Sequence, residues 1–155
     1  MVLDFLWRLR GSVALDPAVA DPVVLGRIEQ LLSRQGKDIA RRGVGGLSFN
    51  GPLWSIGLLV QFRSMYIFDR GRFWIATDGK GRRLRYRLYS RQLMAVSIIG
   101  AGMFLVIGWA TEGSVRGLGI GGLAFAWLYG INFLPAAVRV PLAVRGAVRK
   151  ARRQI

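Results

Sequence analysis

The residues whose types and spacing best suggest chemistry are the arginines of residues 82–89, RRLRYRLY. Arginines alternate there with leucine and tyrosine, and successive side chains of a strand point to opposite faces. The pattern therefore predicts a strand with one apolar face and one guanidinium face. Guanidinium groups bind phosphates well, so the chemistry indicated is the binding of phosphate groups.

Catalytic chemistry has little support in the sequence. The chain has no His and no Cys, which removes the commonest general base, the commonest metal ligand and all thiolate chemistry. Several carboxylates fall where turns or helix caps need them, and no spacing between them indicates acid–base work. They are Asp4, Asp16, Asp21, Glu29, Asp38, Asp69 and Asp78. We expect a non-enzymatic protein with no catalytic residue, cofactor or metal site.

One formal nucleotide-binding motif is present, but its context is wrong. Gly117, Gly119 and Gly122 match G-x-G-x-x-G, which needs a preceding strand and an acidic residue about 20 positions later. These glycines instead open an uncharged apolar segment, and no Asp or Glu follows Glu112. The glycines are therefore better explained by helix packing than by a dinucleotide.

Two apolar segments determine where the arginines lie. The chain has 155 residues, 52% of them hydrophobic, yet carries a net charge of +15, which argues against a freely soluble nucleic-acid-binding domain. Residues 93–110 and 118–138 contain no charge. As helices they would be about 27 and about 32 Å long, against a hydrocarbon core of about 30 Å. Core helices of a soluble bundle would have a polar face, which both segments lack. We predict a two-helix transmembrane hairpin within residues 91–138.

The charges around this hairpin predict its orientation. Six cations precede the first span, only Arg116 lies in the connecting turn, and six follow the second span. By the positive-inside rule both termini are cytoplasmic, in a bacterial-type inner membrane. We expect anionic lipid headgroups to contact eleven of these flanking cations. These are Arg82, Arg83, Arg85, Arg87, Arg91, Arg139, Arg145, Arg149, Lys150, Arg152 and Arg153.

Small residues in the two spans indicate close helix packing. Gly122, Ala126 and Gly130 form a small-x-x-x-small stripe in the second span, and Gly100 and Gly108 lie two turns apart in the first. Such residues allow helix backbones to approach closely. They serve either the hairpin itself or contact with another subunit, and the sequence leaves both alternatives open.

The remaining segments predict a small cytoplasmic α+β domain over residues 16–90, with one helix on a three- or four-stranded antiparallel sheet. Asp21 is expected as the N-cap with Pro22 at the first helical position, giving a helix over residues 22–35. A weak strand is expected within residues 39–50, and further strands at residues 65–68, 72–77 and 82–89. Residues 53–62 suit either a strand or an interfacial helix.

The two ends of the chain carry apolar and basic residues together. Residues 1–15 are either an amphipathic segment on the membrane or a segment packed on the domain. Residues 139–155 are expected to form a basic amphipathic tail at the inner surface.

The leading functional hypothesis is an accessory or assembly subunit of a membrane complex, which docks through its hairpin to a protein partner or to another copy. The first alternative is a membrane-permeabilising, holin-like or effector protein. The second is a membrane-tethered nucleic-acid-binding protein, because Trp74, Tyr86 and Tyr89 accompany the basic strand. Nucleic acid is not the expected partner, since the neighbouring span already explains the charge.

Overall fold

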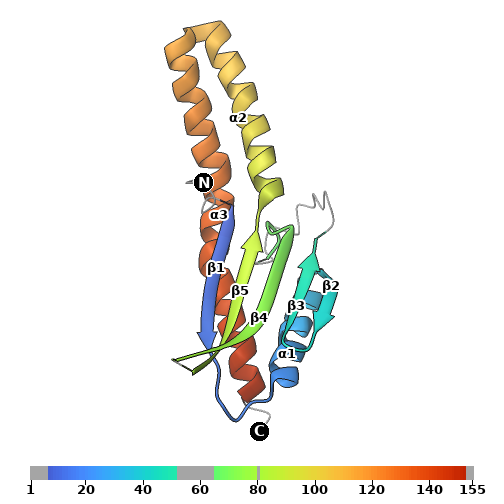
Figure 1. Cartoon of the computed structure of the whole chain (residues 1–155). Coiled ribbons are helices and arrows are strands. Elements are labelled where there is room, and N and C mark those ends of the chain that lie inside the picture. The colour runs from blue at the N-terminus through green and yellow to red at the C-terminus, as the bar shows by residue number, and fades with distance from the viewer. Residues whose placement is uncertain (1–6, 52–64, 80, 153–155) are drawn as a thin grey trace.

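The computed structural model describes residues 7–51, 65–79 and 81–152. Five strands and three helices follow one another along the chain. They are β1 (Arg8–Ala14), α1 (Asp21–Arg34), β2 (Asp38–Gly43), β3 (Gly46–Asn50), β4 (Arg70–Asp78), β5 (Gly81–Tyr89), α2 (Arg91–Glu112) and α3 (Ser114–Arg152). Figure 1 shows α2 and the first part of α3 as a hairpin standing above the sheet, with the rest of α3 running behind the strands.

The strands form one antiparallel sheet in the order β1-β5-β4-β3-β2. The prediction of an antiparallel α+β domain is confirmed, but the prediction of three or four strands is wrong. One added strand is β1, whose Gly11 lies opposite Tyr86. A side chain at Gly11 would collide with the Tyr86 ring, because its Cβ would lie 2.1 Å from the Tyr86 hydroxyl oxygen. The other strand arises because residues 38–50 form the β2–β3 hairpin rather than one strand.

The N-terminal segment was open to two interpretations, and the structure decides between them for part of it. Residues 8–14 form an edge strand paired along their whole length with β5. They therefore pack on the domain rather than forming a helix on a membrane surface. Residues 1–6 of the same prediction lie outside the described residues.

Helix α1 matches its predicted position, with Pro22 in the first turn and Gly36 at φ +68° just after its end. Its cap differs from the prediction, because Ala20 takes the N-cap position and Asp21 is the first helical residue. The Asp21 carboxylate instead pairs with Arg82 of β5. Arg82 also donates hydrogen bonds to the carbonyl oxygens of Pro17 and Val19, both at 3.1 Å. This arginine fixes the β1–α1 connection to the sheet.

The predicted strand at residues 65–68 is wrong. This segment forms a turn ahead of β4, and its apolar residues Met65 and Phe68 are buried in the core. Buried apolar residues at short spacing suit a packed turn as well as a strand, so the pattern did not distinguish them. Residues 53–62, for which the sequence left strand and interfacial helix open, lie within the part of the chain that is not described.

Helix α3 is continuous over 39 residues, with Pro135 and Pro141 inside it. At 1.5 Å per residue it is about 58 Å long, about twice the thickness of a hydrocarbon core. Its last turns place Val140, Val144, Ala147 and Ala151 in the same buried core as α1 and the sheet. The predicted tail is thus helical and amphipathic, but its apolar side packs on the sheet rather than lying open to a lipid surface.

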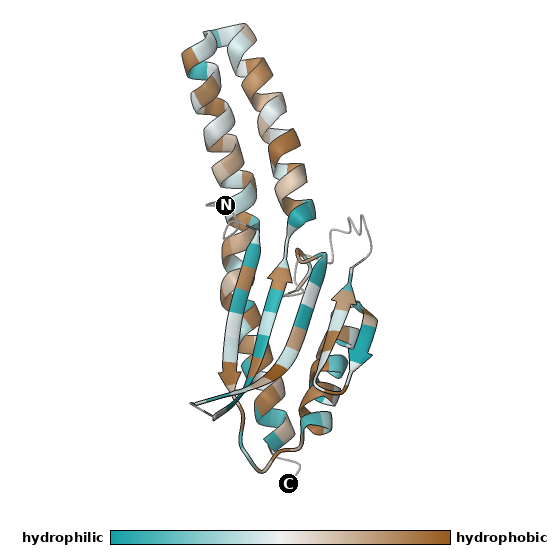
Figure 2. Ribbon diagram, in the orientation of Figure 1, coloured by the Kyte–Doolittle hydropathy of each residue, from teal (hydrophilic) through white to brown (hydrophobic). Residues whose placement is uncertain are grey.

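The hairpin consists of α2 and residues 114–138 of α3, and is called the apolar hairpin below. Both helices are long and apolar enough to cross a membrane. Only 11% and 17% of their most apolar windows are buried, whereas the core helices of a soluble protein are mostly buried. Figure 2 shows hydrophobic residues distributed around both of these helices, while hydrophilic bands cross the strands below. The exposed side chains include Ile99, Phe104, Ile107, Leu123 and Leu134.

Candidate functional site

The sheet has one covered face and one open face. Helices α1 and α3 lie behind it in Figure 1, and no described helix covers the face turned toward the viewer. The strand register places eight arginines on this open face, which we call the arginine face. They are Arg8 and Arg10 of β1, Arg41 of β2, Arg70 and Arg72 of β4, and Arg83, Arg85 and Arg87 of β5. The sequence predicted the arginines of β5, and the fold adds those of three other strands.

Like charges lie directly opposite one another on the arginine face. Arg87 has Arg10 as its cross-strand partner on one side and Arg72 on the other. Like charges in directly opposed positions destabilise a sheet. Among the described residues, the Nε atoms of Arg83 and Arg87 are buried without a hydrogen-bond partner. The fold therefore maintains a concentration of positive charge that its own contacts do not fully neutralise.

Two aromatic rings lie among these arginines. The guanidinium carbons of Arg72 and Arg87 lie 6.0 and 5.8 Å from the centre of the Trp74 ring. Arg8 and Arg91 approach the Tyr89 ring in the same way, at 5.2 and 5.7 Å. Cation–π contacts of this kind offset part of the repulsion between the arginines. They also place planar groups on an open, basic surface.

The sheet is oriented along the apolar hairpin rather than across it. In Figure 1 the strands run in the same general direction as α2 and α3. Arg83 is six residues from Tyr89, or about 20 Å farther from the hairpin at 3.3 Å per residue. A bilayer around the hairpin would lie near Arg91 but far from Arg83 and Arg85. The predicted headgroup contacts stay a prediction, and in this orientation a bilayer would reach the cations at the hairpin end first.

The other cations predicted to contact lipid are distributed around the far end of the domain. Arg85 pairs with Asp78 at 2.7 Å, and Arg152 pairs with Asp16 at 3.0 Å. Arg145, Arg149 and Lys150 project from the last turns of α3, and Arg153 lies outside the described residues. The sequence predicted one set of lipid-contacting cations. In the fold these cations lie in several separate groups.

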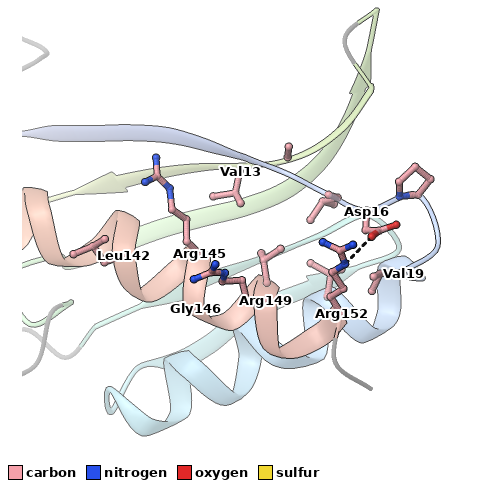
Figure 3. A pocket seen from close by; sticks show the side chains of 13 residues that line it. Val13, Asp16, Val19, Leu142, Arg145, Gly146, Arg149 and Arg152 are labelled. Carbon is pink, nitrogen blue, oxygen red and sulfur yellow. Dashed lines mark ion pairs between the residues drawn. The ribbon is translucent and has the colours of Figure 1, made fainter. Parts of the chain in front are cut away.

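A cavity of about 740 Å³ lies between the last turns of α3 and the β1–α1 connection. Figure 3 shows Arg145 extending from α3 toward β1, with Arg152 reaching Asp16. The apolar part of the lining includes Val13, Val19 and Leu142. This lining provides charge and apolar contact, and Asp16 is the only carboxylate among the described residues of the cavity. No motif in the sequence indicated this cavity.

The five small residues predicted for helix packing divide into two sets. A Cβ at Gly100 would lie 2.8 Å from Leu128 Cδ1, and one at Gly108 would lie 3.1 Å from Gly117 Cα. These two residues therefore face the neighbouring helix. By contrast, a Cβ at Gly122 or Gly130 would meet nothing within 4 Å, and Ala126 is exposed. The stripe on α3 points away from α2.

Sequence reasoning missed two glycines as main contacts of the hairpin. A Cβ at Gly117 would lie 2.7 Å from the backbone nitrogen of Trp109, and one at Gly121 would lie 2.8 Å from Leu105 Cβ. Glycine at these positions permits the close approach of the helices. Both glycines face α2 and so lie on a different side of α3 from Gly122, Ala126 and Gly130.

Lys37 is the one buried charged side chain among the described residues. Its Nζ donates a hydrogen bond to the carbonyl oxygen of Phe68 at 2.9 Å and a longer one to that of Tyr66 at 3.4 Å. Burial lowers the pKa of Lys37 from 10.5, while the charge of Asp69 raises it in part. Lys37 ties the turn before β4 to the segment after α1, which is a structural role.

A Lys37→Met variant is expected to change how stability depends on pH. In the wild type, between the lowered pKa and 10.5, the unfolded chain holds the Lys37 proton more tightly than the folded chain. The contribution of Lys37 to the free energy of unfolding of the wild type therefore rises with pH, by at most about 1.4 kcal/mol per pH unit. Unfolding midpoints in non-ionic detergent from pH 7 to 10.5 should show this rise in the wild type and not in the variant.

Two comparisons make this experiment specific. Burial raises the pKa of Tyr86, which lowers stability near the top of this pH range, but wild type and variant share that effect. Lys150→Met, at an exposed lysine, should keep the wild-type profile. Equal pH profiles for wild type and Lys37→Met would contradict the assignment.

The described residues contain no group of three or more His, Cys, Asp or Glu side chains that could hold a metal ion. The features that remain as candidates are the arginine face, the cavity beside Asp16 and the outward stripe of the hairpin. No protein-family model, curated protein or solved structure matches this chain.

Proposed function

We propose that this protein is a non-enzymatic accessory or assembly subunit of the inner membrane, which docks to a membrane protein through the outward side of its hairpin. The observation that carries the proposal is the orientation of Gly122, Ala126 and Gly130. These residues leave room for a closely packed helix on the side of α3 that faces away from α2. Interfaces between membrane helices are rich in such small residues.

The junction between the hairpin and the domain supports this role, because it is short and tied on both sides. Only Ser90 separates β5 from α2, and its backbone nitrogen donates a hydrogen bond to the Trp7 carbonyl oxygen at 2.9 Å. The backbone nitrogen of Arg91 donates to the Asp69 carboxylate at 2.7 Å. Helix α3 continues from the hairpin into the core without a break. A partner bound to the hairpin would therefore hold the sheet domain at a defined place.

The distribution of charge supports the orientation with both termini in the cytoplasm. Arg91 and Arg139 flank the apolar segments at the domain end, and the turn at the other end carries Arg116 paired with Glu112 at 2.7 Å. Cations next to a span favour the cytoplasmic side and the headgroups of anionic lipids. The sheet domain then lies in the cytoplasm.

Changing the stripe to large residues should remove the partner without preventing insertion. A Gly122→Leu/Ala126→Leu/Gly130→Leu variant fills the space that a neighbouring helix would occupy. A photo-crosslinking residue at Leu123, which is exposed on α3, should give a crosslinked product in membranes for the wild type. We expect this product to fall to background in the variant, while the amount of membrane-inserted protein stays unchanged.

A matched control is Gly102→Leu on α2, which is also exposed with nothing near its Cβ position. It should leave the crosslinked product intact. Equal crosslinking in the stripe variant and the wild type would contradict docking through this stripe. Collapse of the membrane potential on expression would favour the permeabilising alternative, whereas an accessory subunit leaves the potential intact.

A further inference from the structure

We propose that the arginine face binds single-stranded nucleic acid. This inference is independent of the proposed docking of the hairpin. The first observation is the positive charge of the surface: eight arginines from four strands share one open face. Two carboxylates of the described residues lie on this face: Asp78, which pairs with Arg85, and Asp38 of β2, which lies opposite Asn50. A polyanion is the partner whose charge complements such a surface.

The spacing of the arginines matches a repeating anion. Strands lie about 4.8 Å apart, and residues on one face of a strand repeat about every 6.7 Å. Arg10, Arg87 and Arg72 form a row across three neighbouring strands, and Arg85 and Arg83 follow along β5. A flexible single strand laid over the sheet can therefore place successive phosphates against successive guanidinium groups.

The aromatic rings distinguish nucleic acid from other polyanions. Trp74 lies on the same face, opposite Arg85, and Arg72 and Arg87 approach its ring. Bases stack on aromatic rings and on guanidinium planes, and this stacking is tolerant of sequence. All eight cations of the face are arginine, the cation that combines bidentate phosphate contact with stacking. An acidic peptide would use the charge but not the rings.

The direction of the sheet separates this surface from the lipid surface. The sequence predicts contact between the arginines of β5 and lipid headgroups, because β5 is next to the first span. In the fold, β5 runs along the hairpin axis, so the arginine face extends away from a bilayer around the hairpin. Lipid phosphates would reach its hairpin end only, whereas a nucleic acid strand reaches all of it.

The test uses the full chain in nanodiscs of zwitterionic phosphatidylcholine and a fluorescein-labelled 20-nucleotide oligo(dT), followed by fluorescence anisotropy. We expect binding that weakens steeply with salt. An Arg72→Gln/Arg87→Gln variant should bind at least tenfold more weakly and show a smaller salt slope. The matched control, Arg34→Gln/Arg149→Gln, removes two exposed charges from α1 and α3 and should stay within twofold of the wild type.

A second variant separates stacking from charge. Trp74→Ala keeps all the arginines and should still weaken oligo(dT) binding several-fold. Arg72→Lys/Arg87→Lys keeps the charge and protects the test against a variant that fails to fold. Its affinity for oligo(dT) should lie between those of the wild type and the glutamine variant. Thermal unfolding of each variant in the same nanodiscs establishes that the domain is folded.

Three results would overturn the proposal. Equal loss in the face and control variants would show that binding follows total charge. Unchanged binding by Trp74→Ala, together with equal competition by polyglutamate, would assign the face to an acidic protein. Tighter binding of a DNA duplex than of oligo(dT) would remove the single-strand assignment.

Discussion

A Val144→Asp variant is expected to lose the folded sheet domain while keeping the apolar hairpin inserted. Val144 is fully buried in the core shared by α1, α3 and the sheet. An unpaired carboxylate there would cost several kcal/mol, on the order of 3–5 kcal/mol, against a total domain stability of about 5–15 kcal/mol. Limited trypsin digestion of membranes should then cleave the domain at its arginines and leave a protected hairpin fragment.

Two companion variants test the reason for this effect. Val144→Ala removes volume without adding charge, and it should lower stability by a smaller amount, about 1–3 kcal/mol. Lys150→Asp places the same carboxylate at an exposed position two turns along α3 and should resist trypsin like the wild type. A folded domain in Val144→Asp would show that the C-terminal part of α3 does not pack in the core. It would favour the tail on the lipid surface that the sequence predicts.

A Gly121→Leu variant is expected to force the two hairpin helices apart. A Cβ at this position would lie 2.8 Å from Leu105 Cβ and 3.3 Å from the carbonyl oxygen of Ala101, so a leucine cannot fit without moving α2. Overpacking of this kind costs about 1–3 kcal/mol, and more where backbone must shift. Because α2 follows β5 directly and α3 continues into the core, the unfolding midpoint of the whole protein in detergent should fall.

The adjacent residue provides the control for this prediction. Gly122→Leu adds the same side chain one position along, where nothing lies within 4 Å. It should leave the unfolding midpoint of the isolated protein unchanged, although it forms part of the variant that is expected to lose the partner. Equal destabilisation by Gly121→Leu and Gly122→Leu would show that contact with α2 does not determine the loss, since leucine favours the helix more than glycine at both positions.

The sequence predicted best those elements whose signal is local. The uncharged runs, the Pro22 helix start and the alternation of residues 82–89 each depend on neighbouring residues, and the corresponding helices and strands are present. Strand β1 was harder to predict, because it is short, contains Gly11 and pairs with a strand more than 70 residues away. Only the tertiary partner, Tyr86, explains why a glycine occupies that position.

The candidate surfaces, too, were predictable only where their signal is local in the sequence. The arginines of β5 were evident from their alternation, but Arg10 and Arg41 joined them only through pairing between distant strands. The apolar stripe of Val140, Val144 and Ala147 fits a lipid surface and a protein core equally well in sequence. The choice between the two depends on whether a sheet lies within reach, which periodicity does not encode.

The continuity of α3 has a consequence for how the protein is made. Residues 140–151, which complete the core, follow both hairpin segments in the chain and therefore leave the ribosome after them. The sheet strands, which are synthesised earlier, must therefore wait for a segment that follows the hairpin, and such distant contacts are slow to form. The sheet domain is thus completed only after both helices of the apolar hairpin have been made, so a chain that stops before residue 140 leaves its domain unfinished and open to proteases.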